Sequence, residues 1–177
     1  MIRCFIAIAT LVVLSVVATP GFAAADTSMG YCVEQMETRQ ATCFDTEREL
    51  ITYQDQAALR PLVTMFRDAN YVGAGGYRNY VSAYGKDRCD YSQSVREASS
   101  GNLEFDRFST GQIMNDQVSS FVIRADSFCV VYLYEHAGFK SGIVGQKTTS
   151  CPDMRNCVGN GVVTIPFNDV LSSFGVS

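Results

Sequence analysis

The sequence has few of the side chains on which most enzymes and nucleic-acid-binding proteins depend. His136 is the only histidine, and no nucleophile-elbow pattern surrounds a serine. Asp and Glu number 18 against 14 Lys and Arg, and no basic cluster interrupts this acidic balance. We therefore predict a protein that is not an enzyme and has no nucleic-acid partner, with His136 exposed at a hairpin tip.

Signals for two other kinds of site are also missing. The segment 73–76 is rich in glycine, but no Lys-Ser or Lys-Thr follows it, which argues against a phosphate-binding loop. A structural zinc site would need more nitrogen or sulfur ligands than disulfide bonding leaves over. No Asn-x-Ser/Thr glycosylation site occurs after residue 25.

Long apolar runs are confined to the first 25 residues. The run over 4–18 is too short to span a bilayer, for which about 20 residues are needed. The segment 19–21 (Thr-Pro-Gly) breaks this run, and the alanines at 23–25 offer an A-x-A cleavage site. We therefore predict a secretory signal peptide at residues 1–25, a secreted protein and no membrane span.

Seven cysteines become six when Cys4 leaves with the signal peptide. An even number in an exported chain indicates three disulfides more than metal ligands or a catalytic thiol. The sequence alone does not choose among the pairings of six cysteines. Two pairs are attractive as local staples, and the third would then join the two halves of the domain: Cys32 with Cys43, Cys151 with Cys157, and Cys89 with Cys129.

The segment before residue 61 differs from the rest of the chain. Thr46 to Glu49 form a capping-box pattern, and apolar residues follow at helical spacing. This predicts a short helix over about 46–58, ended by Pro61. We place a disulfide-containing, helical N-terminal extension at residues 26–60.

Strand patterns dominate after residue 61. Four β-branched and aromatic runs, each bounded by turn-forming residues, predict strands at 62–66, 121–123, 129–134 and 162–165. No long helical period intervenes after Gly73, which favours an antiparallel β-sandwich over 61–177 in a mainly β protein. The polar segment 84–112 has few apolar residues and is interpreted as a long surface loop or irregular excursion.

A six-residue pattern occurs twice in this half of the chain. Both copies, 115–120 (NDQVSS) and 168–173 (NDVLSS), read [Asn/Asp]-[Asn/Asp]-x-x-[Ser/Thr]-Ser. Two chance copies would be expected on the order of once in 10,000 chains of this size, so we treat them as a repeat. Short side chains with oxygen atoms, gathered in turns, are what a hard cation such as calcium needs.

A second pattern precedes each copy. Phe66 and Tyr71, followed by Gly73, form an aromatic-x4-aromatic-x-Gly pattern. Tyr134 and Phe139 keep the aromatic spacing, although their glycine comes one residue late. The chain after residue 60 therefore contains a larger internal repeat.

This double pattern resembles the βγ-crystallin family, over roughly residues 60 to 177. The resemblance implies two paired Greek-key motifs in a β-sandwich, each with a hairpin folded back over its sheet. Phe66 and Tyr134 would lie as plates over the hairpins, and Gly73 would supply a backbone conformation with positive φ. Ser120 and Ser173 would bind the backbone of the folded hairpins.

The resemblance also implies two calcium sites between the motifs, each served by both. Asp116 and Asp169 would give side-chain oxygens, while Ser119 and Ser172 would each give a hydroxyl to the opposite site. Backbone carbonyls and waters would complete six to eight oxygens. The full predicted metal set is Arg67, Asn115, Asp116, Gln117, Ser119, Glu135, Asn168, Asp169, Val170 and Ser172.

Three departures from the family pattern bear on affinity. Ser141 occupies the usual glycine place in the second hairpin, Arg67 brings a positive charge to its site, and 84–112 enlarges the first motif. Each site would have about one carboxylate, which predicts dissociation constants of roughly micromolar to millimolar.

The predicted function is that of a secreted, monomeric protein whose fold is stabilised by calcium. An alternative uses the same scaffold for interaction. The cysteine-containing N-terminal segment resembles secreted microbial relatives, some of which inhibit metalloproteinases and others of which are antimicrobial, killer-toxin-like proteins. A secreted metalloproteinase or a cell-surface target would then be the partner. Fold alone does not decide between these functions.

Overall fold

The structure is a computed structural model that describes residues 30–84, 89, 98–124, 129–140, 145–147, 149–157 and 169–177. The predicted signal peptide and the strand predicted at 162–165 lie outside these ranges. Within them, no helix is long and apolar enough to cross a membrane.

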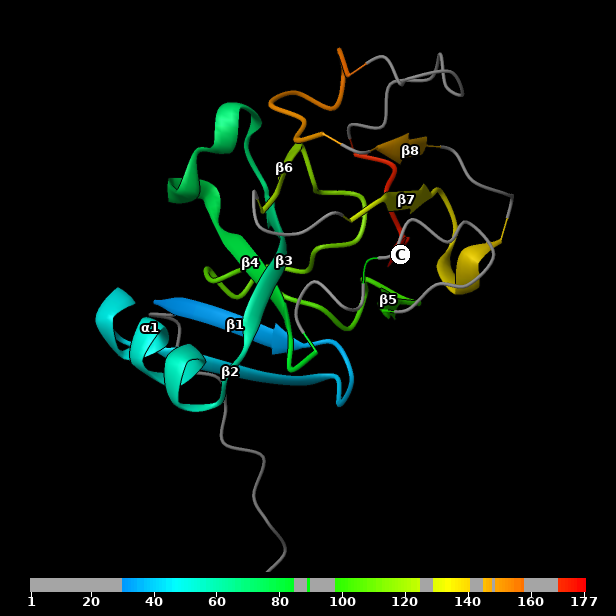
Figure 1. The fold of residues 1–177 in the computed structure, drawn as a ribbon. Coiled ribbons are helices and arrows are strands. Elements are labelled where there is room, and N and C mark those ends of the chain that lie inside the picture. The colour runs from blue at the N-terminus through cyan, green and yellow to red at the C-terminus, as the bar shows by residue number, and fades with distance from the viewer. Residues whose placement is uncertain are drawn as a thin grey trace, which may run out of the picture.

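Two β-sheets make up the fold, one of five strands and one of four (Figure 1). The first has the order β2-β1-β4-β3-β6 and the second the order β5-β9-β7-β8. The predicted fold class, mainly β with two paired motifs, is confirmed. The strands are β1 (Tyr31–Gln35), β2 (Gln40–Phe44), β3 (Arg60–Phe66), β4 (Tyr77–Ser82), β5 (Ala98–Ser100), β6 (Ser120–Ile123), β7 (Val131–Tyr134), β8 (Gly145–Lys147) and β9 (Ser173–Val176).

Each sheet contains a segment from the other half of the chain. β3, β4 and β6 form one antiparallel set, and β7, β8 and β9 form the corresponding set in the second sheet. β5 comes between β4 and β6 in sequence but pairs with β9. Conversely, Cys151 comes between β8 and β9 in sequence, and its backbone forms an isolated antiparallel β-bridge with Phe121 of β6. The first motif therefore gives its third strand, β5, to the second sheet, and the segment at Cys151 adds a single bridge to the edge of the first sheet.

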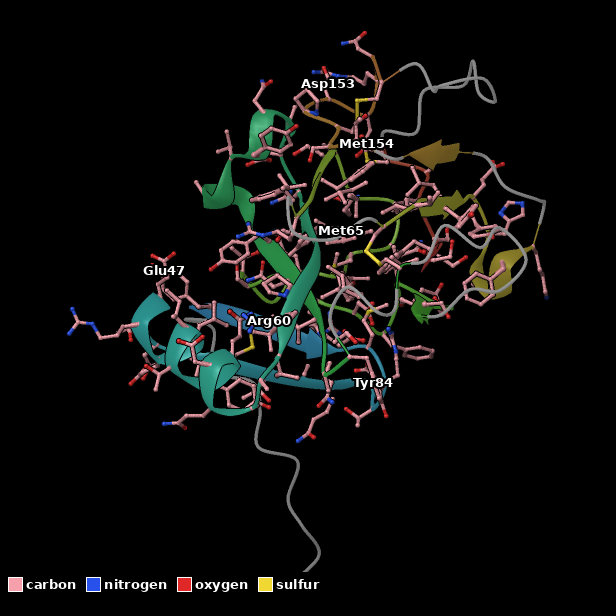
Figure 2. All side chains as sticks on the ribbon, viewed as in Figure 1. Glu47, Arg60, Met65, Tyr84, Asp153 and Met154 are labelled. Carbon is pink, nitrogen blue, oxygen red and sulfur yellow. A yellow bond between two sulfur atoms is a disulfide. The ribbon has the colours of Figure 1, made fainter. Side chains whose placement is uncertain are left out.

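The core lies between the sheets and draws on both. Tyr80 of β4 and Phe174 of β9 are fully buried, and their ring centroids are 4.7 Å apart. Met65 of β3 lies near the centre of the molecule, within the same cluster (Figure 2). Packing across the sheets thus stabilises the crossing of segments between the motifs.

The N-terminal extension contains the predicted helix and also a β-hairpin that was not predicted. β1 and β2 pair antiparallel, and β1 adds to β4 in parallel. The helix α1 (Glu47–Gln56) begins with the predicted capping box, in which the Thr46 hydroxyl accepts from Glu49 N at 3.3 Å. Leu50 of α1 packs in a separate cluster over the outer face of β1 and β4.

Three disulfides link the cysteines in the favoured pattern. Cys32–Cys43 joins β1 to β2, and Cys151–Cys157 closes a short loop. Cys89–Cys129 has a sequence separation of 40 and connects the two halves of the domain. Long loops lose the most conformational entropy on cross-linking, so this third bridge should contribute most to stability.

Within the polar segment 84–112, residues 98–112 form an irregular excursion and not a surface loop, while 85–88 and 90–97 lie outside the described residues. β5 pairs with β9, and Leu103 and Phe108 are fully buried in the core. Asp106 is also buried, because its carboxylate accepts hydrogen bonds from Tyr80 and Ser100 at 2.8 Å each. The surface-loop prediction was wrong because it assumed that polar residues are exposed. In the structure, some of these polar residues are partners in a buried network.

That buried network fastens the N-terminal hairpin to the first motif. Glu34 of β1 is 1% exposed and accepts from Arg78 of β4, Nη2 to Oε2 at 2.6 Å. Arg39 lies in the β1–β2 turn and forms ion pairs with Glu34 at 2.6 Å and Asp106 at 2.9 Å. Burial, and next the Asp106 carboxylate, raise the pKa of Glu34, while the two guanidinium groups oppose this rise. The four charges sum to zero.

The network predicts a large effect of one substitution. Arg78→Met keeps the length of the side chain but leaves Glu34 buried with Arg39 as its one remaining cation. Removing one partner of a buried ion pair costs about 3–5 kcal/mol. We expect urea denaturation to show a loss of that size in the free energy of unfolding. Arg60→Met, at an exposed position, is the control and should change it by about 0.5 kcal/mol or less; equal effects of the two variants would contradict the role of the network.

Candidate functional site: two paired turns

The two repeated turns follow folded hairpins of the same geometry. In the first hairpin, Asn70 and Tyr71 have φ of 60° and 61°, and in the second Gly138 and Phe139 have φ of 71° and 58°. The rings of the aromatic pair contact each other in both, with centroids 5.9 Å apart for Phe66–Tyr71 and 5.3 Å for Tyr134–Phe139. The aromatic-x4-aromatic pattern therefore marks two equivalent hairpins.

The last serine of each turn holds the hairpin of its own motif. Ser120 donates through Oγ to the Asp68 carbonyl at 2.6 Å and accepts from Tyr71 N at 3.2 Å. Ser173 donates to the His136 carbonyl at 2.7 Å and accepts from Phe139 N at 3.3 Å. Both serines are fully buried. The structural role that the resemblance implied for these two hydroxyls is present in both motifs.

The glycine role implied for Gly73 was wrong. Gly73 begins a short 3₁₀ turn and does not have positive φ; the first hairpin reaches a φ of 111° at Gly76 instead. A Cβ at Gly76 would lie 2.6 Å from Thr110 Oγ1 and 2.8 Å from Phe108 Cβ. The chain therefore needs glycine where the hairpin returns to the sheet, beside the segment 108–110. Ser141, at the corresponding glycine place in the second motif, lies outside the described residues.

The turns themselves also match. Asp116 and Asp169 have φ of 54° and 59°, a conformation that Asp and Asn tolerate better than most residues. Ser119 N donates to the carbonyl of Phe66, and Ser172 N donates to the carbonyl of Tyr134, each at 3.0 Å. These bonds bring each turn to the end of the first strand of its motif. Arg67 and Glu135, whose carbonyls were predicted ligands, are the residues that follow there.

The first turn meets the second at Asp116. Asp116 N donates to the Leu171 carbonyl at 3.0 Å, and the Ser172 hydroxyl donates to Asp116 Oδ1 at 3.1 Å. The amide of Asn115 donates to Asp116 Oδ2 at 2.8 Å, and Gln117 Nε2 donates to the Asp116 carbonyl at 2.9 Å. Ser172, the residue expected to reach the opposite site, thus contacts the opposite turn directly. The structure gathers a carboxylate, a hydroxyl and backbone carbonyls at one place.

The second turn is described only in part. Asn168 lies outside the described residues, while Asp169 is exposed and Val170 is partly buried. Ser119, the residue expected to cross from the first turn, has its carbonyl bonded by Met154 N at 2.9 Å. The segment around Met154 therefore borders the second site.

Arg155 is a residue of this region that sequence reasoning missed. Its guanidinium holds the Asp153 carboxylate with Nε–Oδ1 and Nη2–Oδ2 distances of 2.9 Å each. This bond lowers the pKa of Asp153. The pKa of Arg155 is raised, mainly by Asp153 and to a smaller extent by Asp169. Arg67, which we expected to bring positive charge to its site, donates to Gln112 Oε1 at 2.6 Å. No local pattern in the sequence relates Arg155 to Asp169.

The donor set fits a hard cation and not a soft one. In the described part of the chain, no three His, Cys, Asp or Glu side chains gather as a metal cluster. The six cysteines that remain after Cys4 form disulfides, and His136 is exposed, as expected. What the two turns bring together is oxygen, from one carboxylate, hydroxyls and carbonyls, which is the chemistry that calcium takes.

No protein-family model and no curated protein matches this chain. The solved structures that are similar to it are βγ-crystallin domains. A domain from Flavobacterium johnsoniae has a TM-score of 0.39 at 19% identity, covering 66% of this chain and 93% of that one. A domain from Clostridium beijerinckii has a TM-score of 0.36 at 23% identity, covering 65% and 95%. The N-terminal domain of Protein S has a TM-score of 0.38 at 16% identity, covering 66% and 94%.

The two hairpin glycines predict contrasting effects of the same substitution. Gly76→Ala should lower the free energy of unfolding by about 1–3 kcal/mol, because alanine is strained at its φ and the new methyl group meets Thr110 and Phe108. Gly73→Ala should change it by about 0.5 kcal/mol or less, since its Cβ would only touch the Tyr77 ring at 3.6 Å. Thermal and urea unfolding of the pair measure this. Greater damage from Gly73→Ala would restore the role that the sequence pattern implied.

Proposed function

We propose that the two paired turns bind calcium and that the bound ions stabilise the folded chain outside the cell. The observation that carries the proposal is the contact of Ser172 from the second turn with Asp116 from the first. A hydroxyl and a carboxylate from different motifs meet there, so one cation could hold both motifs at once.

At the first site, calcium would start from the contact between Asp116 and Ser172. Asp116 would supply a carboxylate oxygen, and the Ser172 hydroxyl, whose hydrogen can rotate, would offer a lone pair. Glu135 and Gln117 would supply main-chain carbonyls. At the second site Asp169, Ser119, Val170 and Arg67 would take the corresponding roles, with water completing each shell.

The disulfides support the extracellular part of the proposal. Three disulfides in a chain of this size are typical of exported proteins, because the cytosol keeps thiols reduced. Extracellular calcium is abundant, so sites with one carboxylate each would be filled there. The inhibitor and toxin alternatives stay predictions from the resemblance.

Calcium should raise the melting temperature if it binds only the folded chain. At a concentration 100 times the dissociation constant, one site adds about 2.7 kcal/mol, which corresponds to a shift of about 5–10 °C for a chain of this size. The measurement is a thermal melt of the purified protein in calcium and then in EDTA. An unchanged melting temperature at millimolar calcium would rule the proposal out.

Substitution of either aspartate should weaken both sites. Asp116→Asn and Asp169→Asn keep the side-chain shape and the tolerance for positive φ, and remove one charge. Because each site takes groups from both turns, calorimetric titration should show weaker binding at both ions in each variant. Asp55→Asn, on the exposed face of α1, is the matched control. Loss of one ion with the other unchanged would show independent sites.

Arg155 should weaken the second site. Asp169 contributes to the raised pKa of Arg155, so the positive guanidinium should repel a calcium ion bound at Asp169. Arg155→Gln should therefore strengthen binding at the weaker site by roughly two- to fivefold, the size of an exposed charge interaction. The same titration measures it, and the affinity of the stronger site should stay unchanged. Weaker binding in this variant would mean that Arg155 helps to build the site.

A further inference from the structure

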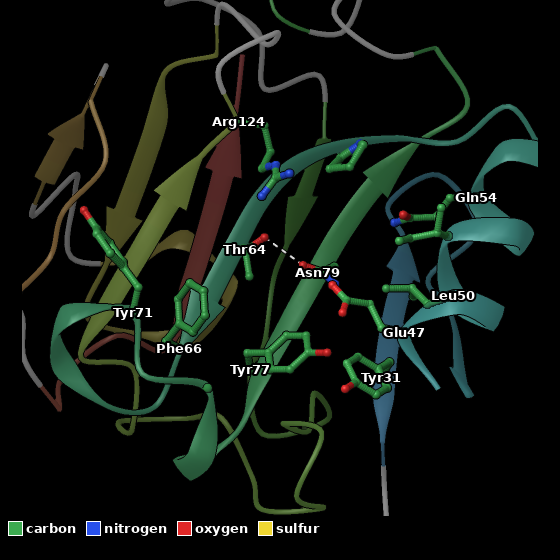
Figure 3. A pocket seen from close by; sticks show the side chains of 13 residues that line it. Tyr31, Glu47, Leu50, Gln54, Thr64, Phe66, Tyr71, Tyr77, Asn79 and Arg124 are labelled. Carbon is green, nitrogen blue, oxygen red and sulfur yellow. Dashed lines mark hydrogen bonds between the residues drawn. The ribbon is translucent and has the colours of Figure 1, made fainter. Parts of the chain in front are cut away.

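A groove lies on the outer face of the five-stranded sheet, between α1 and the first folded hairpin (Figure 3). Its volume is about 380 Å³, within the range of about 300–1,000 Å³ typical of small-molecule sites. β3 and β4 form its floor. Gln54 and Glu47 of α1 line one side, and Tyr71 of the hairpin lies at the other.

The alternation of side chains along β3 and β4 explains which residues line the groove. Met65 points into the core, so its neighbours Thr64 and Phe66 point outward, and Tyr77 and Asn79 do so on β4. α1 covers the adjoining part of the face, where Leu50 packs in one cluster with Val33 and Val81. The helix ends before it covers β3.

The floor of the groove carries an aromatic row that is half-buried. Phe66 lies between Tyr71 and Tyr77, with ring centroids 5.9 Å and 6.1 Å away, and Tyr31 lies 6.2 Å from Tyr77. In each pair the rings are tilted or edge-on and not stacked face to face. Aromatic faces are negative and attract hydrogens on carbons next to oxygen.

Neutral hydrogen-bonding groups lie beside this row. Thr64 is 4% exposed and donates from its hydroxyl to Asn79 Oδ1 at 2.7 Å. That bond fixes the Asn79 amide, whose Nδ2 can then donate to a ligand. Gln54 adds a second amide at the wall. Burial first, then Tyr31 and Glu47, raise the pKa of Tyr77 to about 12, so its hydroxyl stays protonated.

The charges at the groove balance. Glu47 on α1 and Arg124 at the far end are its two charged lining residues, one of each sign. A net charge of zero gives no preference for an anion or a cation. The lining therefore suits a neutral ligand that presents C–H faces to rings and hydroxyl groups to amides.

We propose that this groove binds one or two rings of a neutral oligosaccharide. A pyranose ring has apolar C–H faces and a rim of hydroxyl groups that both donate and accept. The C–H face would lie on the row formed by Phe66, Tyr71 and Tyr77. The rim would meet Asn79 and Gln54.

The geometry is less suited to a peptide. β3 and β4 are paired on both edges, to each other and to β6 and β1, so the floor offers no free strand edge for an added strand. A helical peptide needs an apolar floor, and here the Thr64–Asn79 pair lies in the middle of it. A proline-rich peptide could still lie on aromatic rings, and it is therefore a competing outcome of the test.

The test uses purified, calcium-loaded protein and three neutral probes: the β-1,4-linked trimers of glucose and of N-acetylglucosamine, and an α-linked mannose trimer. Each is added to about 10 mM, at which a ligand with a millimolar dissociation constant fills most sites. We expect one trimer to shift the amide resonances of Asn79 and its groove neighbours in NMR spectra. Tyr71→Ala and Asn79→Asp should each weaken its binding about tenfold.

The controls separate binding from folding. Asn79→Asp keeps an acceptor for Thr64, so its melting temperature reports whether the fold is intact. Phe105→Ala removes an aromatic ring that is 82% exposed and does not line the groove, and should leave binding unchanged. Asp116→Asn should also leave saccharide binding unchanged. The calcium proposal could therefore fail without the saccharide proposal failing. No shift with any trimer, equal binding by the variants, or shifts of the same residues by a proline-rich peptide alone would overturn the proposal.

Discussion

The crossing of segments between the two motifs is the constraint on which the rest of the fold depends. β5 leaves the first motif to pair with β9, and the segment at Cys151 leaves the second to reach Phe121. The second sheet takes a strand from the first motif and the first sheet takes a bridge from the second, so the two motifs are held side by side and their turns face each other. The contact of Ser172 with Asp116 follows from this topology. A cation bound there would stabilise the pairing of motifs more than either motif by itself.

The buried charge network sets the register of the N-terminal hairpin. A slip of one residue in β1 would turn Glu34 to the outer face and place Val33 or Gln35, neither of them charged, against Arg78. Buried ion pairs add little net stability compared with apolar packing, but removal of one partner strongly destabilises the fold. Glu34, Arg78 and Asp106 therefore act mainly against wrong pairings. This is a structural use of charge, distinct from the oxygen ligands of the turns.

The repeat in the sequence predicted the paired motifs, because its signals are local: aromatic spacing, an Asp that tolerates positive φ, and a serine after each turn. The same local reading missed β1, β4 and the buried segment 98–112. Their inward faces carry Glu34, Arg78 and Asp106, which break the apolar alternation that marks a strand. It also failed at Gly73, since only the neighbouring segment 108–110 shows why Gly76 must be glycine. Contacts between distant segments have no local signature.

The same N-terminal hairpin and helix that the network fastens also create the groove. Outer faces of antiparallel sheets are ordinarily polar, whereas this one carries Phe66 and Tyr77. α1 covers part of that aromatic surface and forms a wall beside the rest. Phe66 lies between the two proposed sites, since its ring lines the groove and its carbonyl accepts from Ser119 N, but none of its atoms is a proposed calcium ligand. Because the two proposed sites share no ligand atom, the aromatic row should keep its saccharide affinity when calcium is lost.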